Sequence, residues 1–109
     1  MLSKRIRIDV YLPEKKAKVY RRLRKAIEAE LLFTFGGCTV IEGVRGLYLS
    51  SGEKPEEDRI TRVYADMPFS LDDRREEVSI YADALREAVA EALPEQSILV
   101  TVEEIYHSL

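Results

Sequence analysis

The hydrophobic residues of this chain follow two different periods, and the order of those periods limits the folds it can adopt. Residues 4–12 alternate strictly, with Ile6, Ile8, Val10 and Leu12 on one face, which predicts a half-buried strand. In the later segments, the hydrophobic residues recur at helical or strand spacing. The series predicts strands over residues 4–12, 39–49, 59–66 and 96–106, and helices over about residues 14–32 and 71–93.

The order β-α-β-β-α-β predicts a ferredoxin-like α+β sandwich, with an antiparallel sheet in strand order 4-1-3-2 and two helices on one face. At 109 residues the chain is expected to form one domain over residues 1–109. Pro13 is expected to open the first helix, and residues 51–58 are expected to form a polar turn between the middle strands. Ser70 begins a pattern like a capping box, and Leu93-Pro94 marks the end of the second helix.

Composition predicts a soluble cytoplasmic protein. No run of about 18 apolar residues would span a membrane, and the single cysteine, Cys38, excludes an internal disulfide. The chain has no Asn and one Gln, while 34% of it is charged. Loss of thermolabile amides with charge enrichment is typical of thermophilic proteins.

Charge is divided unevenly along the chain. Residues 1–25 carry a net charge of +8, so residues 26–109 carry −11. The basic residues of the first predicted helix fall away from its apolar stripe, which favours a solvated face and leaves a binding surface for an anion as the alternative. Because the remainder is strongly acidic, we expect no nucleic-acid binding there.

Four of the five glycines fall within residues 34–48, and glycine clusters mark left-handed backbone, bulges or close approach of another group. Right-handed crossovers bring the start of the second strand, the end of the third and the start of the second helix to one pole. A small anionic ligand would suit the backbone N–H groups there. The predicted ligand-binding residues are Gly36, Gly37, Thr39, Asp66 and Ser70. Alternatively, Gly36-Gly37 only ends the first helix.

The uncovered face of the predicted sheet mixes charged and aromatic side chains, which is typical of a protein interface. Its residues are Arg5, Arg7, Asp9, Tyr11 and Tyr64. We therefore expect a homo-oligomer, with Asp9 as a cross-strand ion partner. Stacked bases on these rings would be the alternative, but neither motif of an RNA-recognition sheet is present.

The sequence indicates no catalytic centre, metal site or cofactor. Cys38 and His107, the only thiol and the only imidazole, belong to strands at opposite edges of the predicted sheet, roughly 14 Å apart by strand spacing. Asp66, Asp72 and Asp73 fall near one pole without the ligand spacing of a known metal site.

The segment Phe35-Gly36-Gly37-Cys38-Thr39-Val40-Ile41, followed by Gly43 and Gly46-Leu47-Tyr48, resembles a motif of a large set of small, uncharacterised bacterial and archaeal proteins. More remotely, the layout is similar to the trimeric nitrogen-regulatory and CutA-type proteins. The resemblance implies a ferredoxin-like fold and no assigned activity. The segment between the middle strands is too short for the long loop of the nitrogen regulators, and their nucleotide-binding motifs are absent.

Two functions remain open from the sequence. The first is a small oligomeric regulatory module that binds a ligand or partner at the glycine-rich pole. The second is an enzyme that uses a dimer of open sheet faces as a barrel, with Tyr48, Tyr64, Asp66 or His107 in proton transfer.

Overall fold

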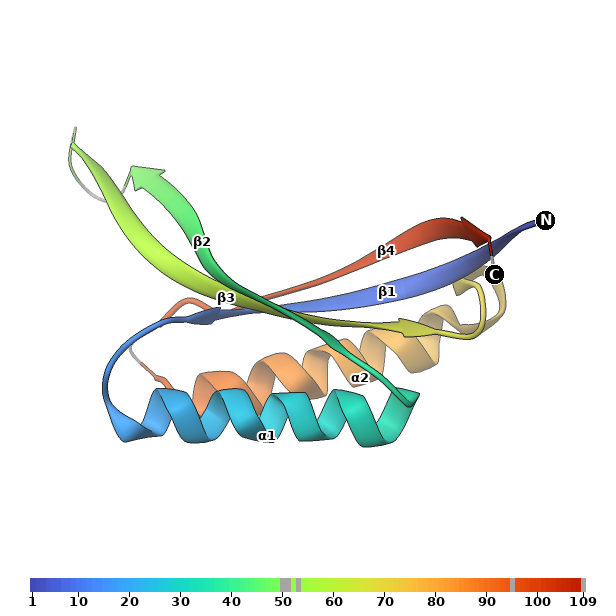
Figure 1. The fold of residues 1–109 in the computed structure, drawn as a ribbon, viewed down its shortest axis with the longest axis horizontal. Helices are drawn as coiled ribbons and strands as arrows, with labels where there is room; N and C mark the ends of the chain where they lie inside the picture. Colours follow the sequence, from blue (N-terminus) through green and yellow to red (C-terminus); the bar gives the residue numbers. More distant parts are fainter. Residues whose placement is uncertain (50–51, 53, 95, 109) are drawn as a thin grey trace.

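The four strands form one antiparallel sheet, and both helices pack on the same face of it (Figure 1). The structure, a computed structural model, describes residues 1–49, 52, 54–94 and 96–108. Its elements are β1 (Leu2–Pro13), α1 (Lys18–Phe35), β2 (Thr39–Leu49), β3 (Pro55–Met67), α2 (Leu71–Ala92) and β4 (Leu99–Ser108). The sheet order is β2-β3-β1-β4, so the predicted ferredoxin-like fold and strand order are confirmed.

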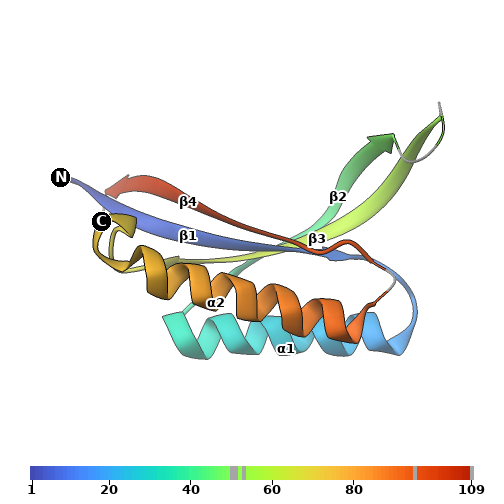
Figure 2. The same cartoon turned by 180° about the vertical axis from the view of Figure 1, so that it is seen from behind.

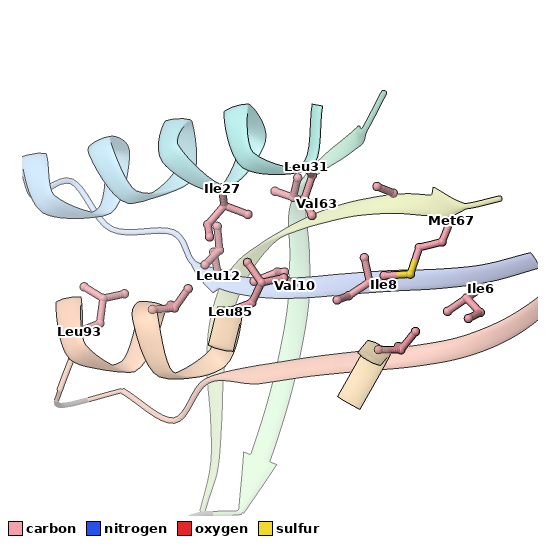
Figure 3. Packing of buried hydrophobic residues seen from close by; sticks show 13 residues of the cluster. Ile6, Ile8, Val10, Leu12, Ile27, Leu31, Val63, Met67, Leu85 and Leu93 are labelled. Carbon is pink, nitrogen blue, oxygen red and sulfur yellow. The ribbon is translucent and has the colours of Figure 1, made fainter. Parts of the chain in front are cut away.

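The core lies between the sheet and the two helices (Figure 3). The alternating side chains of β1 supply its centre, because Ile6, Ile8 and Val10 have no exposed surface. Ile27 and Leu31 of α1 face them from the helix layer. The remaining buried apolar side chains come from β1, β3, α2 and the residue that follows α2, and they are Leu12, Val63, Ala65, Met67, Val78, Leu85, Val89 and Leu93.

The predicted starts of α1, β4 and β3 are wrong, each because an extended segment or turn replaces the expected element. Pro13 ends β1, where it pairs with Ile60, and the Glu14 N–H donates to the Arg59 carbonyl at 2.9 Å. The chain therefore stays extended along β3, and α1 begins at Lys18 rather than near residue 14. At the other end, the Gln96 N–H closes a turn onto the Leu93 carbonyl at 3.0 Å, which delays β4 to Leu99.

The predicted polar turn over residues 51–58 is too long. Pro55 already pairs with Leu49, and the pairing continues through Asp58, so β3 begins at residue 55 rather than 59. The Arg45–Glu57 ion pair, 2.6 Å long, joins the two strands here, which explains how so charged a segment forms a strand. Ser51 and Glu53 of the predicted turn lie outside the described residues.

A β-bulge divides the β2–β3 hairpin, as the glycine near it predicted. The register shifts between Ile41 and Val44, and Gly43 takes a φ of +70°, which favours glycine. Beyond the bulge, residues 44–49 and 55–60 form a projection that we call the hairpin arm. It curves away from the layer of helices (Figures 1 and 2). None of the described helices is long and apolar enough to cross a membrane.

Candidate functional site

A shallow pocket of about 390 Å³ lies at the end of the sandwich where α1 ends, β2 begins and β3 ends, which we call the glycine pole. Its volume is within the range of small-molecule sites. The lining residues come from β1, the end of α1, the α1–β2 connection, the start of β2 and β3. They are Arg5, Phe35, Gly36, Gly37, Cys38, Thr39, Tyr64, Ala65 and Asp66. The topology thus brings together four of the five predicted ligand-binding residues.

The two glycines at this pole have different conformations. Gly36 ends α1 with a φ of +85° and donates its N–H to the Leu32 carbonyl at 2.8 Å. This is a left-handed helix cap, as the alternative interpretation of the pair predicted. Gly37 takes no left-handed conformation, and a Cβ atom there would meet no heavy atom within 4 Å. The backbone therefore requires glycine at position 36 but not at position 37.

Among the described strands, none lies beside the last residues of β3 on the β2 side. Thr39, the first residue of β2, pairs with Tyr64, whereas β3 continues to Met67. The edge from Ala65 onward is therefore uncovered by β2, and such an edge presents unpaired backbone donors and acceptors. Gly37 and Cys38 lie beside this edge in the pocket wall.

Phe35 forms an aromatic wall of the pocket, held by α2. Its ring meets the ring of Tyr81 edge to face, with centroids 5.5 Å apart. The Tyr81 hydroxyl donates to Glu30 at 2.9 Å. Burial, together with this hydrogen bond, raises the pKa of Tyr81 to about 12, so the phenol stays protonated and keeps its role as donor. The contact fixes the end of α1, and with it Gly36 and Gly37, against α2.

The charges of the pocket are unequally neutralised. Arg7 donates to both carboxylate oxygens of Asp66, at 2.8 and 3.2 Å, and its guanidinium lies 4.2 Å from the centre of the Tyr64 ring. The hydrogen bond with Asp66 raises the pKa of Arg7. Arg5, by contrast, makes no ion pair with any described residue. The glycine pole therefore offers a free cation and suits an anionic ligand.

The structure separates the predicted residues into two groups. Gly36, Gly37, Thr39 and Asp66 line the pocket, although both oxygens of Asp66 are already bound by Arg7. Ser70 lies at the N-cap of α2 but outside the pocket, and its hydroxyl makes no capping hydrogen bond, so the predicted capping box is wrong. Sequence reasoning missed Phe35 and Ala65, since only the pairing and ring geometry place them here.

The open face of the sheet is internally paired. Asp9 is 2% exposed and accepts a hydrogen bond from the Arg62 Nε at 3.0 Å, with a second bond from Nη2. The expected cross-strand ion partner is thus confirmed. Arg62 also lies over Tyr11 and Tyr64, at 5.4 and 5.9 Å from the ring centres. Because arginines already cover the rings, this face is poorly arranged for stacked bases.

The groups considered for catalysis are dispersed. Burial, followed by the charge of Glu28, raises the pKa of the Cys38 thiol, which disfavours the reactive thiolate. His107 pairs with Ser3 at the edge strand β4, with 3.1 Å between Nε2 and the Ser3 hydroxyl. Tyr48 pairs with Glu56 in the hairpin arm, far along the sheet from Tyr64. Within the described part of the chain, no three His, Cys, Asp or Glu side chains form a metal-binding group.

No protein-family model and no curated protein matches this chain. Solved structures do match it. CutA1 from Oryza sativa has a TM-score of 0.61 at 21% identity, covering 97% of this chain and 84% of that one. The PII-like nitrogen regulatory protein CPII from Thiomonas intermedia K12, bound to ADP, AMP and bicarbonate, has a TM-score of 0.55 at 16% identity, covering 100% and 98%.

A third similar structure is the divalent cation tolerance protein CutA1 from Thermus thermophilus, with a TM-score of 0.56 at 16% identity, covering 94% of this chain and 84% of that one. At such identities the likeness concerns the fold. The remote similarity to nitrogen-regulatory and CutA-type proteins, inferred from the order of elements, is confirmed at that level.

Proposed function

We propose that this protein is a small oligomeric regulatory module that binds an anionic small molecule of the adenine-nucleotide class at the glycine pole. The observation that carries the proposal is the pocket in which Gly37, the unpaired Arg5 and the uncovered edge of β3 meet. Phe35 supplies aromatic surface for a base. Arg5 supplies a cation for a phosphate.

Gly37 strengthens the proposal because its conformation leaves its identity unexplained. The backbone at this position is not left-handed and a Cβ atom there would meet no heavy atom within 4 Å, yet the residue that lines the pocket here is glycine. Close approach of a ligand to the backbone is a physical reason to keep such a position free of a side chain. ADP and bicarbonate, which are bound in CPII, are the natural first probes.

Gly37→Val is expected to weaken ADP binding at least about tenfold while changing the free energy of unfolding by less than about 1 kcal/mol. Gly36→Val is the matched control, since valine at a φ of +85° is strained and is expected to cost about 2 kcal/mol. Isothermal titration and urea denaturation measure the two effects. No ADP binding by the unmodified protein, or equal destabilisation by the two variants, would contradict the proposal.

Self-assembly is the second part of the proposal, and the hairpin arm supports it. Leu47 and Leu49 are 63% and 73% exposed. They are two residues apart in β2, so they lie on the same face of the strand. β2 is also an edge strand of the sheet. An exposed, apolar edge strand favours pairing with another chain, so we assign the contact between copies to the hairpin arm.

A further inference from the structure

A second and larger pocket, of about 560 Å³, lies at the end of the sandwich opposite the glycine pole. It is framed by the β1–α1 connection, the first turns of α1 and the part of β3 beside the bulge. The lining residues are Leu12, Pro13, Glu14, Lys15, Lys16, Tyr20, Arg21, Arg24, Arg59 and Thr61. Five of these ten side chains are cationic and one is acidic.

The one acidic lining residue is already engaged. The Glu14 carboxylate accepts the Gly43 N–H, at 3.2 and 3.3 Å from its two oxygens, and lies 3.7 Å from the Arg59 Nε. Lys15, Lys16 and Arg21 make no ion pair with any described residue. The pocket therefore keeps an excess of uncompensated positive charge.

Two buried polar atoms in the same pocket have no hydrogen-bond partner among the described residues. Thr61 has no exposed surface, and its hydroxyl oxygen is one of them. The Arg24 Nε is likewise buried without a partner, since the nearest carboxylate oxygen of Glu28 is 3.9 Å away. An unpartnered buried polar group is costly and uncommon in a folded protein. Both atoms would be satisfied by an acceptor-rich ligand.

The N-terminus of the helix that borders the pocket also favours an anion, although the Tyr20 N–H already donates to the Ala17 carbonyl at 3.1 Å. α1 begins after Ala17, which provides no side-chain cap, and its first turn has no acidic residue. The first N–H groups of a helix lack intrahelical partners, and the helix dipole favours an anion there. Thr61 pairs with Leu12 in the sheet, so it lies on the helix side of the sheet, facing the start of α1.

We propose that this pocket binds a small phosphorylated molecule, with the phosphate among Lys15, Lys16 and Arg21 and an oxygen acceptor directed at the Thr61 hydroxyl. Leu12, Pro13 and Tyr20 form an apolar wall for the organic part of such a molecule. A nucleic-acid duplex fits less well, because its phosphates lie on a convex surface and the unpartnered groups are recessed beneath the sheet. The site is independent of the glycine pole.

Inorganic pyrophosphate is the probe, titrated calorimetrically into the full chain. We expect a Kd between about 1 μM and 1 mM. Reversing two pocket charges, in Lys15→Glu/Lys16→Glu, is expected to weaken binding more than about tenfold. The matched control, Arg22→Glu/Lys25→Glu, changes the net charge by the same amount at α1 residues outside this pocket. It is expected to weaken pyrophosphate binding less than about threefold.

Variants at Thr61 distinguish a specific binding site from general electrostatic attraction of the anion. Thr61→Val keeps shape and burial but removes the hydroxyl, so we expect the fold to persist and pyrophosphate binding to weaken about tenfold, while Thr61→Ser keeps it. No pyrophosphate binding, equal losses from the two charge reversals, or unchanged binding by Thr61→Val would each overturn the proposal. Tighter binding of a DNA duplex that Arg22→Glu/Lys25→Glu also abolishes would overturn it in favour of a nucleic-acid surface.

Discussion

Replacing Arg62 by alanine is expected to lower the free energy of unfolding by about 3 kcal/mol. Asp9 is 2% exposed, and Arg62 is its only hydrogen-bond partner among the described residues. The second carboxylate oxygen, Oδ1, is already buried without a partner in the described part of the chain. Removing the guanidinium would therefore leave a buried carboxylate charge uncompensated, a change far more costly than the loss of an exposed ion pair. Urea denaturation measures the effect.

Two further variants test this explanation. Arg45→Ala removes an equally close pair, Arg45–Glu57, whose side chains are 68% and 50% exposed, and it should change stability far less. Adding Asp9→Asn to Arg62→Ala removes the uncompensated carboxylate charge and should recover much of the lost free energy of unfolding. If Arg62→Ala were as mild as Arg45→Ala, the Asp9–Arg62 pair would contribute little to the fold.

The arrangement of elements followed from the sequence because side-chain period and burial coincide. The alternation of Ile6, Ile8 and Val10 is the core face of β1, and the right-handed crossovers then determine which loops share a pole. The boundaries were less predictable, because backbone pairing overrode local signals. Pro13 ends a strand rather than opening a helix, and the charged start of β3 is held by pairing with β2.

The two pockets differ in how much the sequence could indicate. Topology alone places Gly36, Gly37, Thr39 and Asp66 at one pole, so much of the lining of the first pocket was predictable. The basic residues near the start of α1 were equally visible, but a solvated helix face gives the same pattern. What distinguishes the second site is the pair of unpartnered atoms on Thr61 and Arg24, and these depend on side-chain packing that no sequence pattern encodes.

Reversing the polarity of the hairpin arm, in Leu47→Lys/Leu49→Lys, is expected to convert the protein from an oligomer to a monomer of 12.5 kDa. Each leucine exposes most of its side chain, so its replacement should cost the fold little. In an interface, each apolar anchor contributes about 2 kcal/mol, so losing both should weaken association by about a thousandfold. Lysine is also the residue with which natural proteins protect edge strands.

Sedimentation equilibrium at micromolar concentration measures the change, and Ile80→Lys is the matched control. Ile80 is 64% exposed on α2, away from the hairpin arm, so its charge should leave the mass unchanged. A monomeric unmodified protein would contradict self-assembly itself. Equal dissociation by Ile80→Lys would instead place the contact on the helices, and β2 would then be an exposed edge protected by its strong curvature rather than by a second chain.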